Sequence, residues 1–195
     1  MIFKIKIDKL LITVIVAFLC MPFTSFAQKY NLDIQKSSLI VFGTSNIHDW
    51  DIKTENQKGF ILINAENSLQ IKELNIVVEA ESLKSGKGGM DKNTYKALNT
   101  NDYKTIEFNL ISSDKITDLD NENYNVTAKG DLTISGVTKR ITLEFKVNIE
   151  SNLVSITGEK NIKMTDYKID PPKALLGTIK TGDDVLIKFN TILKK

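Results

Sequence analysis

The segment from Gly130 to Val147, GDLTISGVTKRITLEFKV, constrains the fold more than any other part of this chain. Apolar residues occupy alternate positions on both sides of a short Ser-Gly-Val-Thr turn: Leu132, Ile134, Ile141, Leu143, Phe145 and Val147. Because successive side chains of a strand point to opposite faces, each arm has one apolar face and one polar face. The segment therefore predicts an antiparallel hairpin in a sheet that covers an apolar interior.

Residues 1–27 have the features of a secretory signal. They combine a positive start at Lys4, Lys6 and Lys9, an almost unbroken apolar run over residues 10–21, and the small-residue end Ser25-Phe26-Ala27. We therefore expect cleavage between Ala27 and Gln28, a domain over residues 28–195, and a periplasmic or secreted protein. The alternatives are a retained anchor, for which the run is shorter than the ~20 apolar residues that span a bilayer, and lipidation at Cys20. After cleavage we expect no stable membrane insertion.

The composition changes once this signal is removed. The formal charge of the whole chain is +2, and it falls to zero for residues 28–195, so no global basic field is left to attract nucleic acid. Cys20 is the only cysteine, so the domain has no disulfide and depends on its apolar core. A chain of ~150 residues buries about 70% of its unfolded surface, which is enough for one stable domain.

Alternating patterns predict eight or nine strands along the domain. They cover residues 30–34, 38–45, 60–64, 74–80, 105–112, 124–134, 140–149, 153–164 and 185–193. One short helix is expected over residues 90–98, after a glycine-rich loop. Pro171 and Pro172 exclude a central strand, so residues 167–183 are expected to form a flap. Many antiparallel strands with one helix indicate an all-β sandwich or closed barrel.

Few residues carry a pattern typical of catalysis. His48 is the only histidine, and it is followed by Asp49 and Asp51, so it could act as a general base or a metal ligand. A polar turn that orients Trp50 explains the same residues, and we favour it. The glycines at 86, 88 and 89 precede a helix and lie beside Lys84 and Lys87, so this loop is either an ordinary connection or a site for an anionic head group.

Three segments of the chain resemble the YceI-like family of exported bacterial proteins. They are the Gly130–Leu143 hairpin sequence, the stretch from Met90-Asp91-Lys92 through Tyr103 to Phe108, and the stretch from Met164-Thr-Asp-Tyr to Thr181-Gly-Asp-Asp-Val. Together with the region of Phe42 and His48, the three segments extend over nearly all of the expected domain, and their order and spacing match those of the family. The resemblance implies an all-β, eight-stranded antiparallel lipocalin-like barrel that encloses an apolar tunnel. It also implies a carrier of isoprenoid, quinone-like or fatty-acid-like lipids, without catalytic residues.

We therefore expect an exported protein that sequesters or carries an apolar lipid inside the barrel, with no cofactor, no metal and no enzymatic activity. The candidate ligand-binding residues are the large apolar side chains of the expected strands: Phe42, Trp50, Phe60, Phe108, Leu132, Ile134, Leu143, Phe145 and Phe189. Two alternatives stay open: an envelope structural or interaction module with a filled core and no ligand, and a lipid hydrolase or isomerase that uses His48. The sequence also leaves a homodimer open.

Overall fold

The computed structural model describes residues 27–66 and 68–195, so the expected signal lies outside the described residues except for Ala27. The strands are β1 (Gln28–Leu32), β2 (Ser38–Ser45), β3 (Asp49–Thr54), β4 (Gln57–Asn64), β5 (Gln70–Glu79), β6 (Leu83–Lys84), β7 (Thr105–Asp118), β8 (Asn123–Ile134), β9 (Val137–Glu150), β10 (Leu153–Lys163), β11 (Lys173–Ala174) and β12 (Ile179–Lys194). The helix α2 spans Gly88–Leu98, and short 3-10 turns are η1 (Ala80–Ser82), η2 (Met164–Tyr167) and η3 (Leu175–Gly177).

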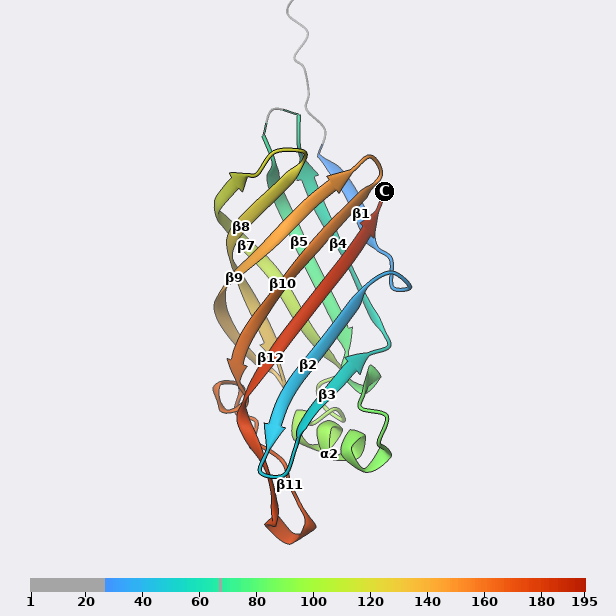
Figure 1. Ribbon diagram of the computed structural model, residues 1–195, viewed down its shortest axis with the longest axis vertical. Helices are drawn as coiled ribbons and strands as arrows, with labels where there is room; N and C mark the ends of the chain where they lie inside the picture. Colours follow the sequence, from blue (N-terminus) through green and yellow to red (C-terminus); the bar gives the residue numbers. More distant parts are fainter. Residues whose placement is uncertain (1–26, 67) are drawn as a thin grey trace, which may run out of the picture.

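The strands close into an eight-stranded antiparallel barrel (Figure 1). One edge of β12 pairs with β10 along its length, and the other edge pairs first with β2 and then with β1. The strands β1 and β2 therefore occupy one position in the barrel, and β3 with β4 occupy the next. The pairing of β1 with both β4 and β12 closes the ring, which confirms the predicted fold class.

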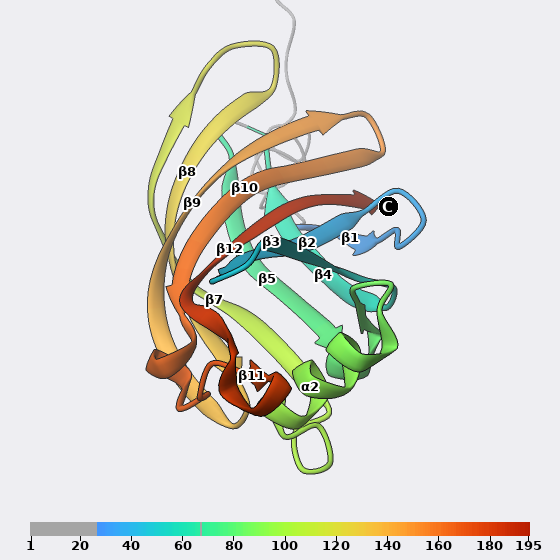
Figure 2. The same cartoon turned by 60° about the horizontal axis from the view of Figure 1, so that its bottom comes forward.

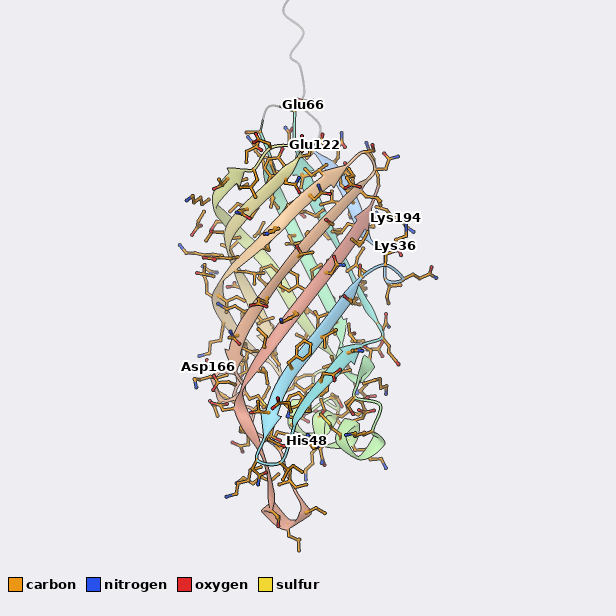
Figure 3. The ribbon with its side chains drawn as sticks, in the orientation of Figure 1. Lys36, His48, Glu66, Glu122, Asp166 and Lys194 are labelled. Atoms are coloured by element: carbon orange, nitrogen blue, oxygen red, sulfur yellow. The ribbon has the colours of Figure 1, made fainter. Side chains whose placement is uncertain are left out.

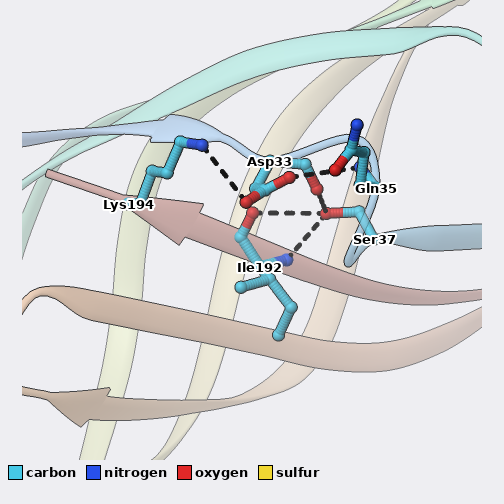
Figure 4. Close-up of polar contacts among 5 residues, drawn as sticks. All are labelled: Asp33, Gln35, Ser37, Ile192 and Lys194. Atoms are coloured by element: carbon cyan, nitrogen blue, oxygen red, sulfur yellow. Dashed lines mark hydrogen bonds and ion pairs between the residues drawn. The ribbon is translucent and has the colours of Figure 1, made fainter.

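The break between β1 and β2 is held against β12 by polar contacts (Figure 4). Ser37 Oγ accepts a hydrogen bond from the Ile192 backbone amide at 2.9 Å and donates to the Asp33 carbonyl at 2.7 Å. Lys194 Nζ lies 3.3 Å from Asp33 Oδ2. These contacts satisfy backbone groups that the interrupted ladder leaves unpaired, so the barrel stays closed at the break.

The hairpin predicted over Gly130–Val147 is present as the paired strands β8 and β9. Its turn is shorter than the sequence pattern suggests, because Ile134 pairs directly with Val137. Ser135 and Gly136 have φ of 49° and 74°, and positive values at both positions are what a two-residue type I′ turn requires. Ser135 Oγ donates to the Leu98 carbonyl at 2.9 Å, which ties this turn to the end of α2.

The predicted helix is also present, and it ends where Asn99 adopts a left-handed conformation, with φ of 50°. Several predicted strand limits were wrong, and β3 was not predicted, because residues 46–51 were interpreted as a turn. The largest changes are in β7 and β12. The polar run after Ser112 continues as β7 to Asp118, since two register irregularities carry it along β8. The last strand begins at Ile179 and not at Val185, because the flap folds back as β11 and pairs with it.

The largest cluster of buried apolar residues lies toward the end of the barrel where the C-terminus lies (Figure 1). Ile61, Val154 and Leu193 have no measurable exposure there. Two smaller clusters lie toward the other end, one around Tyr167 and Ile169 and one around Ile52 and Leu83. Partly buried side chains of α2 pack against both of these clusters, so the helix closes part of that end of the barrel (Figure 2).

Candidate ligand-binding cavity

The barrel encloses a cavity of about 540 Å³ between the packed end and the helix. Pockets of about 300–1,000 Å³ are typical of sites for small organic ligands. Strands from all around the barrel contribute to the wall, and α2 and the flap complete it.

The inward face of each strand supplies the wall. On β12 the lining residues are Ile179, Thr181, Val185, Ile187, Phe189 and Thr191, and on β9 they are Ile141, Leu143 and Phe145. The intervening residues Glu144 and Lys188 are exposed. The period of two that predicted the strands therefore separates a lipid-like interior from a hydrated exterior.

The register places lining residues in rows around the wall. Trp50 lies opposite Gly43, Gly43 opposite Val185, and Val185 opposite Ile162. The next row toward the packed end contains Ile52, Val41, Ile187 and Lys160. Both rows belong to the same cavity, so it extends along the barrel axis and is longer than one layer of side chains.

The cavity reaches the surface at the end that carries α2 and the flap. Its lining there includes the exposed residues Ile47, His48, Lys87, Gly89 and Lys173. Figure 3 shows His48 at this end and Glu122 at the opposite end. We call this opening the mouth, and at the other limit of the cavity the lining residues Phe145 and Ile156 are buried in the packed core.

Seven of the nine predicted ligand-binding residues line the cavity. They are Trp50, Phe108, Leu132, Ile134, Leu143, Phe145 and Phe189. Their contact with a ligand stays a prediction, but the structure brings their side chains to one enclosed space.

Phe42 and Phe60 do not line this cavity. The ammonium of Lys188 lies 5.8 Å from the ring centre of Phe42, and that of Lys29 lies 4.1 Å from the ring centre of Phe60. The neighbours Val41 and Ile61 take the inward positions instead: Val41 lines the cavity and Ile61 is in the packed core. Phe42 and Phe60 are therefore left out of the site.

Several lining residues were not predicted. They include Leu39, Val41 and Ile187 on strands, and Met90, Asn93, Thr94 and Ala97 on α2. The strand residues point to the same face of the sheet as Phe189 or Trp50. The alternation of inward and outward side chains, counted from those two positions, would have identified them. The helix residues had no such signal, since a short helix with a weak apolar face does not indicate which side covers a cavity.

The charged side chains that line the cavity are all lysines: Lys87, Lys160 and Lys173. No aspartate or glutamate of the described residues contributes to the lining. Lys160 Nζ donates to the Thr142 carbonyl at 2.8 Å, below the point where the β9–β10 ladder ends at Phe145 and Gly158. The cavity is thus apolar with a positive bias, which disfavours a cationic ligand.

His48 lies in the turn between β2 and β3, at the mouth. Its Nδ1 lies 2.9 Å from the Asp49 carbonyl, and the turn is held by the Ser45 hydroxyl, which donates to the His48 carbonyl at 2.7 Å. The imidazole is exposed and contacts the backbone of Asp49, not its carboxylate. In the part of the chain that the structure describes, no cluster of histidine, cysteine and carboxylate side chains could hold a metal. These contacts agree with the polar-turn interpretation.

Tyr167 packs into the wall with 2% exposure. Burial, with a smaller contribution from the Asp166 carboxylate, raises the pKa of its hydroxyl to about 12. The hydroxyl has no hydrogen-bond partner among the described protein groups. The phenol is therefore neutral over the physiological pH range and acts as part of the apolar wall.

Polar contacts fix α2 beside the mouth. Asp91 accepts hydrogen bonds from the Ser85 amide at 2.8 Å and the Ser85 hydroxyl at 2.6 Å. The Tyr95 hydroxyl lies 2.9 Å from the Glu81 carbonyl and accepts from Lys84 Nζ at 2.6 Å. The loop before α2 is thus held by hydrogen bonds between Ser85 and Asp91. The carboxylate of Asp91 lies in the first turn of α2, where a bound anion would otherwise lie.

The closed antiparallel barrel with an end-opening apolar cavity defines the lipocalin-like class of β-barrels. The chain belongs to the YceI-like family, since the model of the YceI-like domain matches residues 30–193. Among the described residues, no helix combines the length and hydropathy needed to cross a membrane. Among curated protein sequences, none is significantly similar to this chain.

Solved structures share the fold at low sequence identity. BcnA of Burkholderia cenocepacia has a TM-score of 0.67 at 17% identity, over 83% of this chain and 98% of that chain. A polyisoprenoid binding domain from Saccharophagus degradans, implicated in plant cell wall breakdown, has a TM-score of 0.67 at 17% identity, over 85% and 97%. The YCEI protein of Campylobacter jejuni has a TM-score of 0.57 at 18% identity, over 73% and 82%.

Proposed function

We propose that this protein is an exported carrier that holds the apolar chain of an isoprenoid or another long-chain lipid inside the barrel. The observation that carries the proposal is the enclosed cavity of about 540 Å³, which has an apolar wall and opens at one end. The solved polyisoprenoid binding domain with the same fold supports the choice of ligand class. The composition of residues 1–27 supports export.

The driving force would be removal of the lipid chain from water. Burial of one methylene contributes about 0.8 kcal/mol, so ten methylenes contribute about 8 kcal/mol before the costs of association and ordering. The preformed wall lowers those costs, because Leu143, Phe145 and Val185 are already buried in the folded barrel. A micromolar dissociation constant needs about 8.2 kcal/mol of net free energy, so a ligand that binds this tightly must bury more than ten methylenes.

Binding rather than catalysis fits the residues of the site. The lining is apolar apart from lysines, one histidine and neutral polar groups near the mouth. His48 is exposed there, and its contact with the Asp49 carbonyl does not provide the carboxylate partner that orients a general base. We propose that the head group stays near the mouth while the chain extends toward Phe145.

The alternative of an interaction module with a filled core is disfavoured by the same cavity. A barrel filled by its own side chains would leave no such cavity, whereas about 540 Å³ is open between the largest buried cluster and α2. A periplasmic or secreted location and a homodimer remain predictions of the sequence.

A binding titration tests the proposal. The protein is stripped of lipid and titrated with a polyprenyl alcohol while the emission of Trp50, the only tryptophan, is followed. We expect a saturable change with one ligand per chain, because Trp50 lines the cavity. No saturable binding of polyprenyl alcohol or of a fatty acid would contradict the proposed function.

A further inference from the structure

The tip of the flap exposes two leucines. Leu176 and Leu175 have relative exposures of 109% and 71%, the highest of any large apolar residues in the described part of the chain. They form the turn η3 between β11 and β12, and we call Leu175–Gly177 the flap tip. Single exposed apolar residues are common on protein surfaces, but a projecting pair of fully exposed leucines is not.

The backbone of the flap tip is unfavourable for leucine. Leu175 and Leu176 have φ of 47° and 55°, in the left-handed region where a Cβ atom clashes with the backbone. Glycine or asparagine would adopt this conformation at lower cost. Strain of this kind is often found where a residue serves a function other than stability.

The flap tip is held in place by the rest of the fold. Lys173 pairs with Lys180 in the β11–β12 ladder, and the Thr178 amide donates to the Leu175 carbonyl at 3.1 Å. Asn46, in the turn between β2 and β3, donates through Nδ2 to the Thr178 carbonyl at 2.9 Å and accepts from the Lys180 amide at 2.9 Å. The two leucines are therefore presented by an ordered hairpin.

The flap tip lies at the mouth end of the barrel (Figures 1 and 2). Pro172 and Lys173, which lead into it, line the cavity, and so does Ile179 immediately after it. Ile47 in the adjacent turn also lines the cavity and is the next most exposed large apolar residue, at 58%. The three most exposed large apolar side chains of the described residues thus lie at the same end of the barrel, where the cavity opens.

The charge of the flap favours an anionic partner. Over residues 167–183 the chain carries Lys168, Lys173 and Lys180 against the acids Asp170 and Asp183, and Asp183 lies away from the tip, where it accepts hydrogen bonds from Thr165. Lys173 and Lys180 lie opposite each other at the base of the flap tip. Two exposed leucines above a pair of lysines match an anionic bilayer, in which apolar groups insert and cations contact the head groups.

We propose that the flap tip docks on a lipid bilayer containing anionic lipids and turns the mouth toward the membrane. Leu175 and Leu176 enter the boundary between head groups and acyl chains, and Lys173 and Lys180 lie at the level of the head groups. A narrow tip of two side chains is too small for a stable protein interface, which buries about 800 Å² on each partner. An apolar chain could then pass between bilayer and cavity without crossing bulk water.

Vesicle flotation tests the docking. The protein is expressed from its complete sequence and incubated with vesicles of neutral phosphatidylcholine, or of the same lipid with one third phosphatidylglycerol. The variant Leu175→Asn/Leu176→Asn removes the apolar tip and keeps residues that tolerate left-handed backbone. The control is Leu119→Asn, which changes another exposed leucine, at 45% exposure, beside the turn that contains Glu122 at the opposite end (Figure 3).

We expect the protein to float with anionic vesicles and the double variant to bind them at least about tenfold less, since burial of a leucine side chain changes partition by about that factor or more. The Leu119 control should bind like the unchanged protein. Lys173→Gln/Lys180→Gln should weaken binding to anionic vesicles by about 25-fold and leave binding to neutral vesicles unaffected, because each lysine near an anionic surface contributes about fivefold.

Equal flotation of the double variant and the unchanged protein would overturn the proposal, and so would the absence of any vesicle binding. A complex with a second copy or with another protein that depended on the leucines, without vesicle binding, would also overturn it. Docking is separable from the carrier function. Leu175 and Leu176 do not line the cavity, so the double variant should still bind polyprenyl alcohol with unchanged affinity.

Discussion

The indole of Trp50 lies directly over the backbone of Gly43. The two residues are cross-strand partners in the β2–β3 pair, and a Cβ atom placed on Gly43 would lie 2.1 Å from Trp50 Cζ2. Trp50 Nε1 donates to the Thr44 carbonyl at 3.0 Å, which fixes the ring in this position. The absence of a side chain at residue 43 therefore allows the tryptophan to form part of the cavity wall near the mouth.

Substitution of this glycine should displace the tryptophan. We expect Gly43→Ala to lower the free energy of unfolding by about 1–3 kcal/mol, as overpacking does in other cores, and to shift the emission of Trp50. Urea denaturation and fluorescence spectra measure both effects. Gly88→Ala is the matched control, since a Cβ atom there meets nothing within 4 Å. Equal stability of the two variants would contradict the described packing.

A bulky residue inside the wall should block the ligand. Ile187 lines the cavity, whereas its neighbour Leu186 pairs with Phe42 on the outer face. We expect Ile187→Trp to reduce the affinity for polyprenyl alcohol at least tenfold while the barrel stays folded. The variant Leu186→Trp should bind polyprenyl alcohol with unchanged affinity. Retention of a radiolabelled ligand on the purified variants measures the difference. Equal loss in both variants would argue against binding in this cavity.

Removal of the Tyr167 hydroxyl should stabilise the protein. A buried hydroxyl without a partner costs about 1–3 kcal/mol, so Tyr167→Phe should raise the free energy of unfolding by about 1 kcal/mol. Tyr30→Phe is the control, because the equally buried Tyr30 donates to Gln28 Oε1 at 2.9 Å and should lose about 0.5–1.5 kcal/mol. Thermal and urea unfolding compare the two. A loss of stability in Tyr167→Phe would show that its hydroxyl has a partner.

Acid should loosen the loop before α2 and the turn η2 before the buried core. Hydrogen bonds from the Ser85 side chain and backbone lower the pKa of Asp91, and those from Thr165 lower the pKa of Asp183. Their folded pKa values lie below the unfolded value of 3.8, so their stabilisation is complete above that pH and is lost as the pH falls through the folded values. Hydrogen exchange should show earlier loss of protection near Ser85 and Thr165 than near Val154, and Asp91→Asn with Asp183→Asn should reduce this dependence on pH.

The charge of the lining should discriminate among ligands with the same chain. Because Lys87, Lys160 and Lys173 are its charged residues, we expect hexadecylamine to bind at least fivefold more weakly than hexadecanol, and hexadecanoate to bind at least as well as the alcohol. Competition against a fluorescent fatty acid gives the three affinities. Lys160→Met should reduce the difference in affinity between hexadecylamine and hexadecanoate. Preferential binding of the amine would contradict this description of the cavity.

The sequence predicted the barrel well where one face of a strand is polar. In the β8–β9 hairpin, Asp131, Glu144 and Lys146 alternate with apolar residues, so the inward phase was unambiguous and all four predicted residues line the cavity. Phe42 and Phe60 lie in the runs LIVF and FILI, which are apolar on both faces. Alternation shows which residues share a face, but only the closed sheet determines which face is inside.

The contribution of α2 and the flap could not be read from local patterns. Met90 and Ala97 reach the cavity only because Asp91, Tyr95 and the Leu98 carbonyl tie the helix to neighbouring elements. These contacts join residues 6 to 37 positions apart in the chain, and the longest of them depends on where the β8–β9 hairpin places Ser135. The position of the mouth is accordingly a property of the tertiary structure.

Native mass spectrometry of the protein purified from its own cell envelope shows whether the barrel carries one lipid. We predict a complex whose mass exceeds that of the chain by one long-chain lipid, which dissociates on activation and is absent from the Ile187→Trp variant. A protein that emerges from its envelope without bound lipid, or with the same adducts in the unchanged and Ile187→Trp forms, would contradict the account.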